Sequence, residues 1–248
     1  MRAILMYHSL DPSGSPISIE PGVFRRQLDW LTSGGVRVVS VDQLLTLSDQ
    51  SPCVALTFDD GFANFSFQAA PLLLERGLPA TLFVVTGHIG RDNRWRGRGD
   101  AGVPVLPLLG WEELGRLREE GIILGAHTRT HPRLTGLDGD LLELELANGV
   151  NEMQRRLGQR PKGFAYPYGI VDDRVAHATA AHYQWACTTD LRPLGAAESP
   201  LRLPRLDAWY LRDPARLPEW SSPAFRVWLW YRRQGRRVRA SLARAGGR

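Results

Sequence analysis

Short apolar runs alternate with amphipathic stretches along most of the chain. The runs are bounded by Gly, Pro or Asp and predict buried strands over Ala3–Tyr7, Val36–Val41, Cys53–Phe58, Ala80–Val85, Ile122–Gly125, Gly163–Tyr166 and Trp185–Thr188. The stretches between them carry apolar residues at helical spacing and predict helices over Pro21–Ser33, Val41–Leu47, Asn64–Arg76, Trp111–Glu120, Gly139–Leu157 and Asp172–His182. This repeated strand–helix alternation favours a parallel sheet or barrel.

Chemistry in parallel sheets and barrels gathers at the carboxyl ends of the strands, so functional residues are expected just after a predicted strand. Three polar segments meet that condition. Thr57–Gly61 (TFDDG) ends the third predicted strand, His127–Pro132 (HTRTHP) follows the fifth, and Phe164–Gly169 (FAYPYG) overlaps the end of the sixth.

The second segment places two histidines, His127 and His131, at positions i and i+4. On a helical turn both imidazoles would share one face and could bind one metal ion. Taken alone, such a pair is common by chance, and an Asp-Asp-Gly after a strand is usually a turn. Together, the two histidines and one of the two carboxylates, Asp59 or Asp60, can bind a metal ion and leave coordination positions open for water and substrate. The other carboxylate can then act as a general base. The combination favours a metal-dependent hydrolase.

The three segments resemble the motifs of polysaccharide deacetylases of the NodB-homology type, carbohydrate esterase family 4. The resemblance rests on Leu56–Gly61, on the run from Trp111–Leu114 to Gly125–Pro132, and on Tyr166–Gly169, and it covers most of residues 1–210. It implies an α/β fold, a distorted seven-stranded (β/α) TIM-like barrel. It also implies removal of the N-acetyl group from an acetylated amino sugar in a glycan or glycolipid, with release of acetate.

The resemblance also assigns roles to single residues. It implies one divalent metal ion, commonly zinc, with cobalt or nickel as alternatives, bound by Asp60, His127 and His131. Asp59 would be the base that activates the attacking water. The backbone N–H of Tyr168, with Pro167 before it as a supporting residue, would help to stabilise the oxyanion.

The sequence departs from the commonest family pattern in three places. Ala165 stands where an arginine usually braces the catalytic aspartate, and neither an Asp-x-x-Asp-Trp motif nor a late Leu-x-His-Asp motif is present. Tyr7-His8, at the end of the first predicted strand, instead resembles the circularly permuted branch of the family. In that branch an N-terminal Tyr-His supplies the general acid, so we expect His8 to protonate the leaving amine. A histidine that merely ends a strand is the alternative.

The motifs do not identify the cation that braces Asp59. Arg205 is the candidate, because a fixed guanidinium keeps a carboxylate ionised and oriented, and a surface arginine is the alternative. Asp190 and Asp207 are further candidates for orienting His8. Three other histidines are expected to be peripheral, structural or exposed: His88, His177 and His182.

Two further features bear on specificity and on the core. The Arg/Gly-rich loop Arg91–Pro107, which contains Trp95, is long for a simple connection and is expected to contribute to specificity. Cys53 and Cys187 lie in apolar segments and are expected to be small core residues rather than a disulfide.

The basic charge of the chain belongs to its C-terminal end. The 248 residues have a formal net charge of +5, yet residues 224–248 hold eight arginines and no acid, which leaves 23 basic and 26 acidic residues in 1–223. We therefore divide the chain into a catalytic domain, 1–223, and a basic aromatic tail, 224–248. Arginines beside aromatic residues suit a helix at an anionic membrane surface. A solvated tail with a few aromatics docked on the barrel is the alternative, and nucleic acid is disfavoured because the body has no basic patch.

Other functions remain open for the same motifs. They would also fit a carbohydrate O-acetyl esterase, or a catalytically silent member that only binds glycans. A mononuclear iron oxygenase with this ligand set is less consistent, because such sites usually take the form His-x-Asp then His on a β-sandwich. No apolar run reaches the ~18 residues that span a bilayer, and no secretory signal is recognisable. We expect a cytoplasmic protein that can lie on the inner face of the cytoplasmic membrane.

Overall fold

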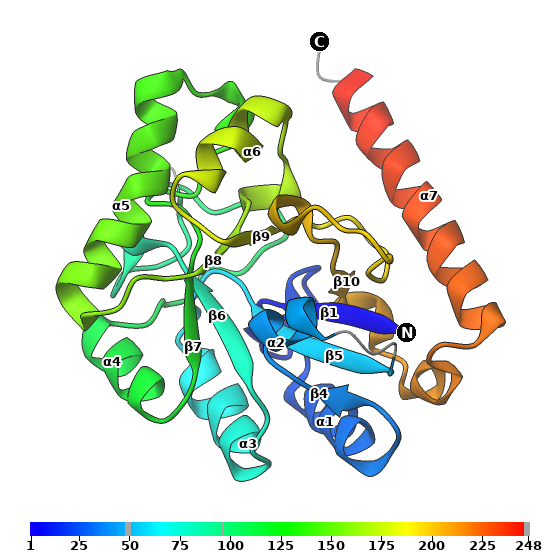
Figure 1. Cartoon of the computed structure of the whole chain (residues 1–248). Helices are drawn as coiled ribbons and strands as arrows, with labels where there is room; N and C mark the ends of the chain where they lie inside the picture. Colours follow the sequence, from blue (N-terminus) through cyan, green and yellow to red (C-terminus); the bar gives the residue numbers. More distant parts are fainter. Residues whose placement is uncertain (48–50, 96, 246–248) are drawn as a thin grey trace.

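A curled, parallel β-sheet forms the centre of the protein (Figure 1); the computed structural model describes residues 1–47, 51–95 and 97–245. In the described chain its strands follow the order β10 (Leu206–Asp207), β1 (Arg2–Tyr7), β5 (Cys53–Phe58), β6 (Ala80–Val84), β7 (Ile123–Ala126), β8 (Gly163–Ala165) and β9 (Trp185–Cys187). Each neighbouring pair is parallel. The predicted α/β fold with a curled sheet of seven strands is confirmed.

The central strands are apolar along their whole length because both of their faces are covered. Every residue of β5 is buried, as is every residue of β6. Cys53 in β5 and Cys187 in β9 are fully buried free thiols, as predicted. Two short strands, β2 (Ser9–Leu10) and β3 (Ser18–Ile19), pair with each other outside the main sheet.

The helices lie around the outside of the sheet (Figure 1). They are α1 (Pro21–Ser33), α2 (Val41–Thr46), α3 (Ala70–Glu75), α4 (Trp111–Glu119), α5 (Gly139–Leu157), α6 (Asp173–Ala180) and α7 (Pro223–Ala245). Local capping explains their limits: Asp138 accepts a hydrogen bond from the N–H of Leu141 at the start of α5, and Gly158 ends that helix in the left-handed region, with φ +66°. The helix predicted over Asn64–Arg76 begins as a π-helical turn, Phe65–Ala69, before continuing as α3.

The strand predicted over Val36–Val41 is shorter than expected and lies beside the main path of the sheet. Only β4 (Arg37–Val38) pairs, with the first two residues of β5. The reason is local, because Ser40 and Gln43 form a capping box that turns the chain into α2. The seventh strand of the path is instead β10. It was not predicted, because its two residues are too few to form a recognisable apolar run.

The segment that leads into β10 joins the two edges of the curled sheet. Leu203 exchanges backbone hydrogen bonds with β9, its N–H donating to Ala186 O (2.9 Å) and its carbonyl accepting from Thr188 N (2.8 Å). Three residues later Leu206 pairs with Leu5 of β1. Arg205 therefore lies at the seam between the first and last strands of the path.

The C-terminal basic segment forms most of α7, and residues 246–248 lie outside the described residues. Phe225 and Leu229 of α7 are buried in the same hydrophobic cluster as β1 and α1. The first turns of the tail thus pack on the body of the protein. Within the described residues, no helix combines the length and the apolar character needed to cross a membrane.

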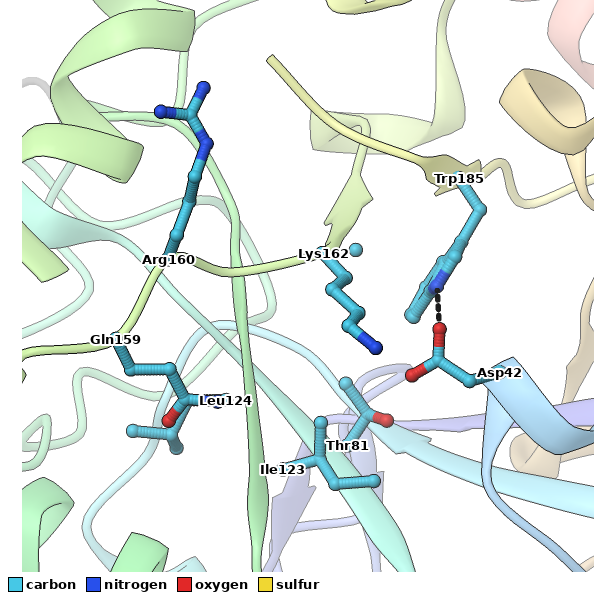
Figure 2. Close-up of a pocket in the computed structure, with 9 residues that line it drawn as sticks. Asp42, Thr81, Ile123, Leu124, Gln159, Arg160, Lys162 and Trp185 are labelled. Atoms are coloured by element: carbon cyan, nitrogen blue, oxygen red, sulfur yellow. Dashed lines mark hydrogen bonds between the residues drawn. The ribbon is translucent and has the colours of Figure 1, made fainter. Parts of the chain in front are cut away.

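The amino ends of the strands hold a pocket of about 150 Å³ (Figure 2). The indole N–H of Trp185 donates to the carboxylate of Asp42 there (3.0 Å), which ties β9 to α2. The three predicted motifs all lie at the other end of the strands.

Candidate metal centre and active site

The carboxyl ends of the strands bring the predicted site residues into one pocket. The pocket has a volume of about 110 Å³, and side chains that follow β1, β5, β7 and β8 line it. Its lining includes His8, Asp59, Asp60, His127, His131 and Tyr168. Residues up to 160 positions apart in the sequence therefore share a few ångströms of space because their strands are neighbours in the sheet.

Asp60, His127 and His131 form a compact group of possible metal ligands. Asp60 Oδ1 lies 3.4 Å from Nε2 of His127 and 3.5 Å from Nε2 of His131. One ligand atom from each residue lies within 4.8 Å of the others, and all three residues are buried. His127 Nδ1 lies 2.6 Å from the carbonyl oxygen of Ala165. When Nδ1 donates its proton to that carbonyl, Nε2 is left as an acceptor facing Asp60.

The chemistry of these three side chains suits a divalent cation. Asp60 Oδ1 and His131 Nδ1 are buried without a hydrogen-bond partner. Leaving a carboxylate oxygen buried and unsatisfied is costly, and a cation between the three side chains would remove that cost. One carboxylate and two imidazoles suit zinc and its neighbours cobalt and nickel.

The charges in the pocket are strongly coupled. Burial alone would raise the pKa of Asp60, but the neighbouring imidazoles outweigh it and hold that pKa well below its usual range. Burial lowers the pKa of His131 to about 3. His131 is therefore neutral at physiological pH, the form in which an imidazole binds a metal.

Strained backbone is concentrated at this site. Of the five non-glycine residues with positive φ in the described chain, four belong to it: Asp60 (73°), Thr128 (67°), His131 (60°) and Tyr168 (60°). Residues that carry a side chain rarely adopt this backbone conformation, and those held in it cluster at functional sites.

Asp59 is held by Arg205 from the seam of the sheet. The guanidinium donates from Nη1 to Oδ1 (2.6 Å) and from Nη2 to Oδ2 (2.7 Å), and Nε donates to the carbonyl of Thr188 (2.9 Å). Arg205 is completely buried. Burial alone would raise the pKa of Asp59, but the charge and hydrogen bonds of Arg205 outweigh it, so the pKa is lowered. The arrangement supplies the fixed cation that Ala165 does not.

His8 also lies close to the carboxylate of Asp59. Its Nε2 is 3.8 Å from Asp59 Oδ2, and a fifth of its side chain is exposed to the pocket. Burial raises the pKa of Asp207, and a charge on His8 opposes that rise, as it also acts on Asp59 and Asp60. Asp190 instead accepts both hydrogen bonds of a fork from Arg233 (2.7 Å each).

The third motif forms a tight turn beside the ligand group. Pro167 is buried and begins the turn Pro167–Gly169, in which Tyr168 has left-handed rather than helical dihedrals. Gly169 has φ +69°, and a Cβ there would lie 2.2 Å from Thr189 Oγ1, so only glycine fits. The ring of Tyr168 meets the ring of His131 edge-on, with centroids 4.8 Å apart.

The long loop Arg91–Pro107 covers one side of the pocket; its residue 96 lies outside the described residues. Trp95 stacks on His131, with ring centroids 4.6 Å apart and planes 29° from parallel. The ring of His88 packs against the ring of Trp95, with centroids 5.0 Å apart. The loop thus touches a candidate metal ligand directly, which is consistent with its expected contribution to specificity.

The two remaining histidines lie on other parts of the surface. His177 is exposed on α6. His182 pairs with Glu143 of α5 (Nε2 to Oε1, 2.8 Å). Neither residue lines the pocket.

Glu145 is a site residue that the motifs did not reveal. From α5 its buried carboxylate accepts hydrogen bonds from the backbone N–H groups of Arg129 and Thr130 (2.8 Å each) and from the Thr130 hydroxyl (2.6 Å). It therefore fixes the turn between His127 and His131. The only signal in the sequence is a glutamate on the apolar side of an otherwise amphipathic helix, next to Leu146.

We expect Glu145→Ala to weaken metal binding about 10- to 100-fold, the range found when groups supporting metal ligands are removed. Glu145→Gln should retain much of the affinity, because its amide can still accept from the backbone and its NH₂ can donate to Thr130. Glu143→Ala, on the exposed side of α5, is the control. Competition with a chelating dye measures the affinity. Equal metal affinity of Glu145→Ala and the wild type would contradict the positioning role.

Comparisons with known proteins show which proteins this chain resembles in sequence and fold. The family model for polysaccharide deacetylases matches residues 47–185. YxkH of Bacillus subtilis, named as a polysaccharide deacetylase, is 27% identical over 193 residues, which are 75% of this chain and 64% of YxkH. Poly-beta-1,6-N-acetyl-D-glucosamine N-deacetylase of Staphylococcus aureus is 24% identical over 63% of this chain and 55% of its own. The chain thus spans less than two thirds of the length of these two relatives. The structure of IcaB from Ammonifex degensii superposes with a TM-score of 0.74 and 25% identity, covering 90% of this chain and 96% of IcaB.

Proposed function

The chain belongs to the polysaccharide deacetylase family, and from that premise we propose that it is a metal-dependent deacetylase. Its reaction would be hydrolysis of the N-acetyl group of an amino sugar in a glycan or glycolipid, releasing acetate. One observation carries the proposal: an Asp–His–His group stands beside a second buried carboxylate, Asp59, that Arg205 holds ionised. A protein that only binds glycans has no need for that second, charged carboxylate.

The residues divide the chemistry between them. A divalent cation held by Asp60, His127 and His131 would supply Lewis-acid polarisation of the acetyl carbonyl and would acidify water. Asp59, which the guanidinium of Arg205 keeps ionised, would take a proton from the attacking water. The backbone N–H of Tyr168 would donate to the developing oxyanion. His8 would give a proton to the amine nitrogen as the C–N bond breaks.

The place of His8 supports the resemblance to the permuted branch. β1 lies between β10 and β5, so the residue that follows it reaches the same end of the sheet as Asp59. His8 can therefore take the general-acid role of the histidine that the late motif usually supplies.

The test is acetate release from N-acetylglucosamine oligomers and from poly-β-1,6-N-acetylglucosamine, with zinc or cobalt added. We expect turnover by the wild type, loss of turnover in Asp59→Asn, and a fall in kcat of about 10²- to 10⁴-fold in His8→Ala. Acetate released only from O-acetylated glycans would favour an esterase. Glycan binding without any acetate release would favour the silent, glycan-binding alternative.

We also propose that the outward face of α7 rests on an anionic membrane surface on the cytoplasmic side. Val227, Trp230, Tyr231 and Val238 are all more than half exposed and recur at helical spacing. Phe225 and Leu229, which pack on the body, occupy the opposite face of the helix. Exposed aromatics flanked by arginines suit a membrane interface.

Because deleting α7 would uncover the core around Phe225, point substitutions test this better. We expect the wild type to sediment with vesicles that contain phosphatidylglycerol, and Trp230→Ser/Tyr231→Ser to stay in solution. Phe67→Ser removes an equally exposed aromatic elsewhere and serves as the control. Sedimentation of the double variant at the wild-type level would refute the membrane contact.

A further inference from the structure

A groove beside the catalytic pocket is not used by the mechanism above. It has a volume of about 790 Å³ and lies between α7 and the segments that follow β8 and β9. Tyr168 and Thr189 line both the groove and the catalytic pocket. A substrate whose acetyl group occupies the pocket can therefore extend into the groove.

The lining of this groove is strongly basic. It contains one carboxylate, that of Asp190, and six guanidinium groups: those of Arg133, Arg192, Arg202, Arg233, Arg236 and Arg237. This contrasts with the rest of residues 1–223, in which acids outnumber bases. The positive charge is thus concentrated where the groove adjoins the reaction site.

The ion pairs of Arg192, Arg233 and Arg236 with Asp190 and Asp207 are either shared or long. Asp190 is shared by two guanidiniums, of Arg233 (2.7 Å) and Arg192 (2.9 Å). The carboxylate nearest to Arg236, that of Asp207, is 3.5 Å away, and Arg236 Nη1 is buried without a hydrogen-bond partner. Glu198 pairs with Arg192, and Asp173 pairs with Arg202.

The inner face of α7 changes character along its length. Its first turns bury Phe225 and Leu229 against the core. One and two turns later the same face carries Arg233 and Arg236 over the groove. A helix that served only to cover the barrel would continue with apolar residues, so the basic half calls for a separate explanation.

We propose that this groove binds a phosphate group of the substrate, so that the enzyme acts on acetylated glycans that carry or are linked through phosphate. The inference rests on the proposed deacetylase function and narrows its substrate class. Guanidiniums gathered along one groove focus a positive potential and offer N–H donors to phosphate oxygens. The phosphate can be a substituent of the glycan or its link to a lipid.

The experiment compares three substrates at equal concentration: tri-N-acetylchitotriose, its 1-phosphate, and its prenyl diphosphate. We expect kcat/KM for the 1-phosphate to exceed that for the neutral sugar about 10-fold or more at low salt, and this preference to shrink as salt is raised. Arg233→Gln and Arg202→Gln should bring the ratio close to 1. Arg202 lies outside α7, so its variant keeps the test valid if Arg233→Gln loosens the helix. Arg232→Gln, on α7 but outside the groove, is the matched control.

Calorimetry separates this inference from the proposed function. N-acetylglucosamine 1-phosphate should bind the wild type and Asp59→Asn more tightly than N-acetylglucosamine does. Turnover of neutral and phosphorylated substrates at the same rate would overturn the phosphate site and leave the deacetylase proposal standing. Arginine-dependent binding of the phosphorylated sugar without any turnover would support the phosphate site and contradict the deacetylase proposal. Arginine variants that lower only the melting temperature would show that these side chains merely hold α7 in place. A preference for the prenyl diphosphate over the 1-phosphate would identify the lipid-linked source.

Discussion

His127→Ala is expected to abolish binding of the divalent ion and to lower deacetylation by more than about 100-fold, since even supporting groups around a metal cost that much. The wild type should contain about one ion per chain. Removing this imidazole leaves one carboxylate and one imidazole, too few to hold a cation in place. The bound ion should also raise the melting temperature of the wild type, because a ligand that binds only the folded state stabilises it.

Elemental analysis of protein purified without a histidine tag measures the ion, and acetate release measures the rate. His177→Ala removes an exposed histidine from α6 and should change neither. The metal should be lost as pH falls, since protons compete for the imidazoles. A variant that keeps both its ion and its activity would rule out the ligand set.

Arg205→Met is expected to destabilise the fold by about 3–5 kcal/mol, because it leaves the buried carboxylate of Asp59 without its cation. Without the guanidinium, burial raises the pKa of Asp59. The acidic limb of the pH–rate profile should therefore move to higher pH. Arg205→Lys keeps the charge but loses the fork and should be intermediate.

The sign of the pH effect on stability distinguishes this pair from ordinary packing. In the wild type the pKa of Asp59 is lowered, so the pair stabilises the fold above about pH 4, the usual range of an unfolded aspartate, and this is lost as pH falls through the folded pKa. The deficit of Arg205→Met should thus be largest near neutral pH and should shrink as pH falls below about 4. The double variant Asp59→Asn/Arg205→Met should recover part of the lost stability. Arg160→Met removes an arginine exposed on the surface and should show no such deficit. A deficit that is independent of pH would mean that only packing was lost.

Much of the fold could be predicted from the sequence because the information is local. The strands from Cys53–Phe58 onward are continuous apolar runs, and the motif residues follow their carboxyl ends directly. Once the strands are parallel, the meeting of Asp60, His127 and His131 follows from the order of the sheet.

The parts that escaped prediction depend on packing between distant segments. β10 has two residues, too few for a periodic pattern, and its position is set by pairing with β1. Arg205 could be named as the candidate brace of Asp59 from its chemistry, and the structure confirms the contact, but only the seam shows why this arginine reaches Asp59. Glu145 has no motif of its own, since its partners are backbone N–H groups of a turn that α5 happens to cover.

The seam has a consequence for how the protein is made. Asp59 leaves the ribosome 146 residues before Arg205, which at ordinary elongation rates is roughly 7 to 30 seconds. During that interval the nascent chain has no guanidinium for this carboxyl, so the end of β5 must stay hydrated or the carboxyl must stay protonated. Only the arrival of the last strand allows Asp59 to be buried as an anion. Closure of the sheet at the seam and burial of the Asp59 carboxylate are therefore coupled steps of folding.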